Sequence, residues 1–339
     1  MGYEEHQCPR CGAAVPARSA GVVHCAYCAT PLVPTRDGFR VSSLFTEESL
    51  VNPDRPRFWL AGSRYRMLGR LAEGETSDVF LALRDHRLVE RVIVKVLRAH
   101  EDRDLFDGEW RTLTELQKST ARGSAHFTRL LPQPVAHGEG RLGVRGDEGL
   151  RRFSVFGFAS GFVHGFGDVR ETYPRGVPAS SAVWLWKRTL ELLAFVHESG
   201  WVHGAVLPRH LLVHARDHGV RLCGWSAATA LGKPLPAFPA DADAFYPGAT
   251  WKGGPATAAT DISMSARSIL WILGGDLREA PKGTPAGLAR LMETCAAPDA
   301  GGFTDARRAI GELDDAAREA YGPPKFIPFA MPGWNIAAG

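Results

Sequence analysis

Four cysteines near the start of the chain are spaced for metal binding. Cys8-Pro-Arg-Cys11 and Cys25-Ala-Tyr-Cys28 are two C-x2-C pairs separated by a short loop. Each pair places two thiolates on one side of a tight turn, and two pairs complete a tetrahedral shell of four sulfurs. Zn²⁺ suits this shell because it accepts soft ligands and imposes no geometry of its own. The spacing predicts a structural zinc site, with a redox dithiol pair or an iron–sulfur centre as the alternatives.

The segment that contains these cysteines, residues 1–33, resembles the zinc ribbons at the head of many microbial proteins. A segment this short has almost no core, so metal binding would supply most of its folding free energy, on the order of 10 kcal/mol. Such ribbons bind nucleic acid in some families and protein in many others. Arg10 and Arg18 stand here against Glu4 and Glu5, which favours a protein contact over a nucleic-acid contact.

A lysine and a glutamate further along the chain are spaced for an ion pair. Val92-Ile-Val-Lys95 places the lysine inside an apolar strand, and Glu109 lies on the helix expected next. With Leu71-Ala-Glu-Gly-Glu-Thr-Ser-Asp-Val-Phe80 before them, these residues resemble the first half of a protein kinase. The resemblance identifies Gly74 as the remaining glycine of the phosphate-binding loop, and Lys95 and Glu109 as the nucleotide-site pair.

The resemblance to protein kinases continues to about residue 321. Gly200-Trp-Val-His203-Gly-Ala-Val-Leu-Pro208-Arg-His-Leu-Leu-Val213 is similar to the catalytic loop, and Val220-Arg-Leu-Cys-Gly224-Trp225-Ser226 stands at the Asp-Phe-Gly motif. His203 matches the loop histidine and Trp225 the aromatic residue of the second motif. Asp261 matches the buried aspartate that anchors the loop. The resemblance implies that these three residues are structural.

The positions that would perform phosphoryl transfer have changed. Ala205 replaces the catalytic base, His210 the metal-binding asparagine, and Gly224 the metal-binding aspartate. Phosphoryl transfer needs an acid to orient the attacking hydroxyl and oxygen ligands to hold Mg²⁺. We therefore predict that the chain is not an enzyme and that these three positions are degenerate.

Nucleotide binding is expected to be weak or absent as well. Ile93 stands where kinases keep a small alanine beside adenine, and its branched side chain would fill that space. Ala72 and Ser77 replace two loop glycines, which leaves the backbone less free to approach phosphates. Gly74, Lys95 and Glu109 are then vestiges of a site for ATP and Mg²⁺.

The elements that must position these residues follow from hydrophobic periodicity. Strands are predicted at residues 64–74, 78–85, 90–99, 127–137 and 152–159, and helices at 105–119, 180–199, 260–273, 285–296 and 304–321. This order of elements predicts an α+β fold with two lobes. The resemblance to protein kinases implies a bilobal protein-kinase-like fold with a β-rich N-lobe and a helical C-lobe, preceded by the zinc ribbon. The predicted divisions are a ribbon at 1–33, a linker at 34–62, the N-lobe at 63–158, the C-lobe at 159–322 and a tail at 323–339.

Composition limits the environment and the partners. The chain has 339 residues, 45% hydrophobic and 23% charged, with a formal charge of +3. This small charge makes a nucleic-acid partner unexpected. Neither a signal peptide nor a membrane span is visible, since the most apolar stretch, residues 182–197, contains Lys187, Arg188 and Glu191. A cytoplasmic protein without a membrane contact is expected.

Three functions remain open at this stage. The first is a pseudokinase scaffold or allosteric regulator whose partner is a protein, such as an active kinase, a phosphatase or an assembly machine. The second is a nucleotide-dependent transferase that uses the fold atypically, with acids such as Asp217 and Asp241 serving a metal. The third is a nucleic-acid-binding ribbon protein. The tail, rich in proline and aromatic residues, either docks on a partner or folds back across its own domain.

Overall fold

The computed structural model describes residues 6–8, 13–15, 23–24, 31–35, 38–41, 56–85, 88–143, 149–297 and 302–331. The chain divides into two compact units. Unit 1 consists of residues 1–106, 134–159 and 332–339, and unit 2 consists of residues 107–133 and 160–331. Antiparallel strands and helices are both present, which confirms the predicted α+β class.

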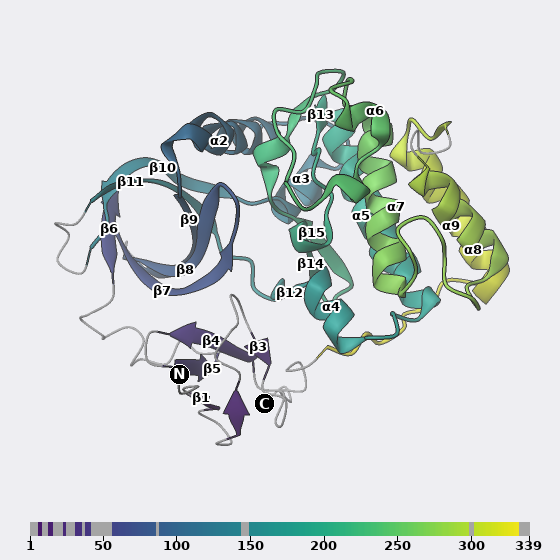
Figure 1. The fold of residues 1–339 in the computed structure, drawn as a ribbon, viewed down its shortest axis with the longest axis horizontal. Coiled ribbons are helices and arrows are strands. Elements are labelled where there is room, and N and C mark those ends of the chain that lie inside the picture. The colour runs from purple at the N-terminus through teal and green to yellow at the C-terminus, as the bar shows by residue number, and fades with distance from the viewer. Residues whose placement is uncertain are drawn as a thin grey trace. The chain divides into compact units, whose positions relative to one another are not determined.

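Unit 1 is built on a six-stranded antiparallel sheet in the order β10-β11-β9-β8-β7-β6. The strands are β6 (Arg57–Leu60), β7 (Ser63–Glu73), β8 (Ser77–Asp85), β9 (Val89–Leu97), β10 (Pro134–Arg141) and β11 (Leu150–Gly157). The two edges come together, because the amides and carbonyls of Arg57 and Gly143 exchange hydrogen bonds of 2.8 and 3.1 Å. The sheet is therefore nearly closed on itself (Figure 1).

The inner face of this sheet is an aromatic and aliphatic core. In β9, Val92, Val94 and Val96 are buried on alternate positions, as a strand with one buried face requires. Phe58 stacks on Tyr65 and Phe153 with ring centroids 4.7 and 3.9 Å apart. Phe58 belongs to β6, which forms within the stretch that the sequence assigned to the linker.

The N-terminal residues contribute two small antiparallel sheets to unit 1. One pairs β1 (His6–Gln7) with β2 (Ala14–Val15), and the other has the order β3 (Val23–His24), β4 (Pro31–Thr35), β5 (Gly38–Val41). Buried Cys8 packs there in an apolar cluster with Val15, Leu32 and Phe39.

The prediction of a zinc cofactor is corrected by this arrangement. Cys8 is the one predicted ligand in the part of the chain that the structure describes, and Cys11, Cys25 and Cys28 lie outside it. Across the described residues, no group of three or more His, Cys, Asp or Glu side chains is placed to hold a metal ion. A tetrahedral zinc shell needs four ligands, and the described residues do not assemble one.

Unit 2 is mainly helical, and its long helices pack side by side (Figure 1). Helix α5 packs on α7 and α9, and α8 packs on the same two helices. The helices are α3 (Ser124–Phe127), α4 (Phe166–Thr172), α5 (Ala179–Glu198), α6 (Gly248–Trp251), α7 (Ala258–Leu273), α8 (Ala286–Ala296) and α9 (Ala306–Tyr321), and the unit also holds most of α2 (Arg103–Gln117). Trp186, Phe195 and Ile269 are fully buried in this core.

Short strands and 3₁₀ turns connect these helices. They are β12 (His164–Gly165), β13 (Trp201–Val202), β14 (Leu211–His214), β15 (Gly219–Leu222) and β16 (Thr229–Ala230), with the turns η3 (Pro208–His210) and η4 (Trp225–Ala227). Strands β12, β14 and β15 form one antiparallel sheet, and β13 pairs with β16. Five predicted site residues lie in these turns or in the loops beside them: His203, Ala205, His210, Gly224 and Trp225.

One predicted strand is wrong in its first half. Residues 127–137 were expected to be extended, but α3 ends at Phe127 and β10 begins only at Pro134. The intervening residues turn because Thr128 Oγ1 donates a 2.7 Å hydrogen bond to the Ser124 carbonyl. In addition, Arg221 Nη2 donates a 2.7 Å bond to the Leu131 carbonyl. Both bonds give a backbone carbonyl a hydrogen-bond partner that does not come from a neighbouring strand.

The described part of the tail folds back on its own unit. Residues 323–331 contain no helix or strand and lie along unit 2, where Phe329 and Met331 are buried. Of the two alternatives for the tail, the structure therefore has docking in cis for these residues. Trp334 lies outside the described residues.

Candidate functional site

The candidate site is built around a buried carboxylate. Asp261, in the first turn of α7, is completely buried. Its Oδ2 accepts hydrogen bonds from the His203 amide at 2.8 Å and from His197 Nε2 at 2.9 Å, and its Oδ1 accepts from the Gly204 amide at 2.9 Å. Asp261 thus fixes the backbone of the loop that follows β13.

His203 joins this loop to the segment after β15. Its Nε2 donates to the Cys223 carbonyl at 3.1 Å, and its Nδ1 accepts from the Ala205 amide at 3.1 Å. The ring also meets Trp225 edge to face, with centroids 4.5 Å apart. Burial lowers the pKa of His203 to about 4, so the imidazole is neutral at pH 7. Both ring nitrogens form hydrogen bonds with backbone groups. His203 therefore links the loop after β13 to the segment after β15.

The three degenerate positions form one interlocked contact. His210 Nδ1 donates a 2.7 Å hydrogen bond to the Ala205 carbonyl, which places the imidazole beside Gly224. Gly224 has φ +75°, and a Cβ there would lie 2.4 Å from His210 Cδ2. An aspartate at position 224 therefore cannot fit while His210 keeps this position. The space at the Gly224 Cβ position is filled by the His210 imidazole ring.

Glu109 and Trp225 meet within unit 2. Glu109 on α2 is 2% exposed, and its Oε1 accepts a 3.0 Å hydrogen bond from the Trp225 amide. The Trp225 indole is buried, and its Nε1 donates to the Leu222 carbonyl at 3.0 Å. The Glu109 carboxylate thus stabilises the turn at Trp225.

Lys95 lies in the other unit. It is half-buried on β9, between Val79 of β8 and Ser154 of β11. Because Lys95 and Glu109 belong to different units, their ion pair stays a prediction.

The hairpin loop that carries Gly74 is held closed by charged side chains. The Gly74 amide donates to the Ser77 carbonyl at 2.9 Å, so this amide already has a partner inside the turn. Arg98 Nη1 donates to Glu73 Oε1 at 2.7 Å and to the Gly74 carbonyl at 3.1 Å. A loop tied down in this way is poorly suited to wrap around phosphates.

The apolar patch next to this loop is filled by its own side chains. Ile93, Leu71 and Phe158 pack on a buried cluster of Leu68, Leu81 and Leu83. Ile93 therefore takes part in packing within unit 1.

Two supporting residues were not predicted. Arg267 on α7 is completely buried, and it donates to the carbonyls of Ala296, Ala244 and Tyr246 at 2.9, 3.0 and 2.8 Å. The Tyr246 hydroxyl then donates to the Gly204 carbonyl at 2.9 Å. A single arginine within the apolar run Ile262–Leu273 was the available sequence signal, because a buried guanidinium must find acceptors.

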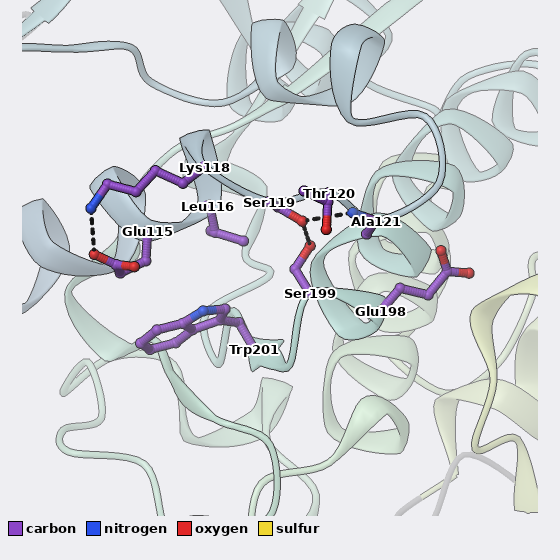
Figure 2. Close-up of a pocket in the computed structure, with 9 residues that line it drawn as sticks. All are labelled: Glu115, Leu116, Lys118, Ser119, Thr120, Ala121, Glu198, Ser199 and Trp201. Carbon is purple, nitrogen blue, oxygen red and sulfur yellow. Dashed lines mark hydrogen bonds and ion pairs between the residues drawn. The ribbon is translucent and has the colours of Figure 1, made fainter.

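A separate cavity of about 440 Å³ lies at the C-terminal ends of α2 and α5 (Figure 2). Polar side chains around it pair with one another: Lys118 bonds to Glu115 at 2.9 Å, and Ser119 Oγ lies 2.7 Å from Ser199 Oγ. Trp201 also lines it. None of the predicted site residues is among its lining residues.

Comparison with known proteins adds no relative. No model of a protein family matches the chain, and no curated protein matches it. Among the helices in the described ranges, none is long and apolar enough to cross a membrane. What the site can do must therefore be argued from its geometry.

The His210–Gly224 contact predicts a steric cost for any side chain at position 224. We expect Gly224→Ala to lower the free energy of unfolding by about 3 kcal/mol or more, through the left-handed backbone and the collision with the ring. Gly200→Ala is the matched control, since Gly200 has φ +83° and open space around its Cβ position. It should cost about 1 kcal/mol. Urea denaturation measures both, and equal costs would contradict the interlock.

The buried imidazole predicts acid sensitivity. His203 has a folded-state pKa of about 4 against an ordinary value of 6.5, so the unfolded state binds more protons between these values. Stability should therefore fall as the pH drops through this window, by about 1.5 kcal/mol between about pH 6.5 and about pH 5.

His203→Gln should lose this part of the pH dependence in urea denaturation at each pH. Asp168, whose pKa burial raises to about 6, titrates in both proteins and cancels in the comparison. Exposed His100→Gln is the control and should keep the wild-type slope. If His203→Gln keeps that slope too, another group is responsible.

Proposed function

We propose that the chain is a bilobal protein-kinase-like protein without phosphoryl-transfer activity, which acts as a scaffold or allosteric regulator of a partner protein. The observation that carries this proposal is the interlock of Ala205, His210 and Gly224. The predicted base position and the predicted aspartate position, Ala205 and Gly224, have no polar side chain, and the His210 ring lies in the space beside Gly224.

The chemistry of the site supports inactivity. Ala205 has no group that could accept a proton, and loss of a general base costs roughly 10²- to 10⁴-fold in rate. Gly224 offers no carboxylate, and an imidazole at position 210 is a poor ligand for Mg²⁺, which prefers oxygen. The residues present do not fit a magnesium-bound triphosphate.

Four acids of unit 2 have structural partners. Asp261 and Glu109 are buried and accept hydrogen bonds from backbone amides. The exposed Asp217 and Asp241 pair with Arg216 and Arg209, at 2.9 and 2.8 Å. These contacts argue against the transferase alternative, which needs acids gathered around a metal.

Within unit 1, two further contacts support weak or absent ATP binding. The Gly74 loop is closed by its own hydrogen bond and by Arg98. Ile93 packs with Leu71 and Phe158 on the predicted adenine side of the sheet. Both contacts favour weak or absent nucleotide binding.

The proposed partner is a protein, as the resemblance implies: an active kinase, a phosphatase or an assembly machine. Inside unit 2, Asp261, His203 and Arg267 hold the loops by buried hydrogen bonds. Such a frame keeps a surface in one geometry, which reduces the entropy lost on binding. We propose a cytoplasmic location for this activity.

The proposal is tested by adding ATP with Mg²⁺ or Mn²⁺ to the full chain and measuring thermal unfolding. We expect no saturable rise in the unfolding temperature, because a ligand stabilises a protein only when it binds the native state. Transfer of labelled phosphate to the chain or to a generic protein substrate should also be absent. The metal ions alone and AMP serve as controls.

A variant with Lys95→Ala distinguishes specific from general effects. If ATP raises the unfolding temperature of the wild type and Lys95→Ala abolishes the rise, a functional nucleotide site exists. That result would contradict the proposal and favour the transferase.

A further inference from the structure

An extended segment of the tail, here called the strap (residues 323–331), lies against unit 2. Its sequence is Pro-Pro-Lys-Phe-Ile-Pro-Phe-Ala-Met. Helix α9 ends at Tyr321, and Gly322 at φ +76° redirects the chain into the strap. Prolines at 323, 324 and 328 fix φ and remove backbone donors, so the segment stays extended and does not continue the helix.

The strap is held by three ring-bearing side chains of unit 2, here called the strap-binding surface: Tyr173, Trp184 and His218. Tyr173 stacks on Phe329 with centroids 5.5 Å apart, and its hydroxyl donates to the Ala330 carbonyl at 2.8 Å. Trp184 meets Phe329 edge to face at 5.3 Å. Phe329 is 7% exposed and is therefore the main anchor.

The second anchor is Phe326, which completes a three-ring stack. His218 lies between Trp184 and Phe326, with centroids 4.1 Å and 4.3 Å away. Its imidazole also hydrogen-bonds the backbone of Ile327. Phe326 itself is 67% exposed, so only one of its faces is covered. The strap is thus fixed firmly at position 329 and more loosely at position 326.

The strap-binding surface belongs to regular elements of unit 2. Trp184 is on α5 and Tyr173 directly follows α4. His218 is in the turn between β14 and β15, and has φ +51°, a strained conformation for a residue with a side chain. That conformation presents the ring between the two aromatic partners. The surface is preorganised for an extended ligand with aromatic anchors three residues apart.

The strap leaves hydrogen-bonding capacity unused on this surface. Trp184 Nε1 and His218 Nε2 are both buried, and neither has a hydrogen-bond partner within the residues that the structure describes. An unpaired buried polar atom costs free energy. A segment that supplied an acceptor to Trp184 and a donor to His218 would therefore bind better than the strap does.

From these contacts we infer that the strap-binding surface is a docking site for a partner protein, and that the strap is its displaceable resident occupant. The partner's segment is extended, contains proline, and carries two aromatic side chains three residues apart. The inference goes beyond the proposed function and does not rest on it, because docking here requires no property of the Ala205–His210–Gly224 contact.

The test uses the full chain and a fluorescently labelled peptide with the sequence of residues 322–331. In the wild type the tethered strap competes, because tethering gives it a high effective concentration. Phe326→Ala combined with Phe329→Ala should free the surface and tighten peptide binding at least tenfold in fluorescence anisotropy, since the competent fraction rises. Adding Tyr173→Ala should then abolish binding. Peptide with both phenylalanines replaced by alanine should not bind.

Two further variants keep the result interpretable. Lys325→Ala trims an exposed side chain of the same strap and should leave the wild-type affinity unchanged. Pro328→Gly keeps both anchors but makes the free strap more flexible, and should tighten peptide binding about threefold. This milder variant replaces the double substitution if circular dichroism shows that the latter does not fold.

Three results would overturn the inference. One is equal peptide affinity for the wild type and the loosened variants, and another is binding that survives Tyr173→Ala. The third is a wild-type dimer in sedimentation that Phe329→Ala dissolves, since this would assign the surface to the strap of a second copy. None of these results bears on phosphate transfer, so failure here is distinguishable from failure of the proposed function.

Discussion

The site depends on a buried carboxylate that receives three hydrogen bonds. Removing Asp261 from water is costly unless donors replace its hydration. Two backbone amides and the His197 imidazole supply them. Because the two amides belong to consecutive residues, His203 and Gly204, the carboxylate fixes both the position and the direction of the loop. His203 then reaches the Cys223 carbonyl, which places the next segment and Gly224.

The frame that this carboxylate organises has no exposed acid at the predicted catalytic positions. The replacement is more than a loss of polar groups, since His210 occupies the space beside Gly224 and bonds to the Ala205 carbonyl. A Cβ at position 224 would lie 2.4 Å from His210 Cδ2, so Gly224 and His210 suit each other sterically. This mutual fit favours a stable structural role for the region.

The strap-binding surface of unit 2 uses other residues than the loops held by Asp261. Its contacts are aromatic stacking and a few side-chain hydrogen bonds to backbone. Such contacts are individually modest and can exchange with similar contacts from another chain. A well-packed unit whose peripheral segment can be displaced suits a protein that binds other proteins.

The sequence by itself determined most of the helices and strands, because these depend on neighbouring residues. The predicted strands at residues 64–74, 78–85 and 90–99 and the four long helices of unit 2 match the structure closely, because alternation and helical periodicity are written in neighbouring residues. It also singled out His203, Trp225 and Asp261, which contact one another in the structure through a hydrogen bond and a ring pair. Only the tertiary structure decided where the strap lies and that His210 fills the space at Gly224, because contacts between distant residues leave no periodic signal. Tertiary hydrogen bonds from Thr128 and Arg221 likewise replaced half of a predicted strand with turns. The zinc prediction is corrected on the described residues alone: they hold no group of three or more His, Cys, Asp or Glu side chains placed for a metal, and Cys11, Cys25 and Cys28 lie outside them.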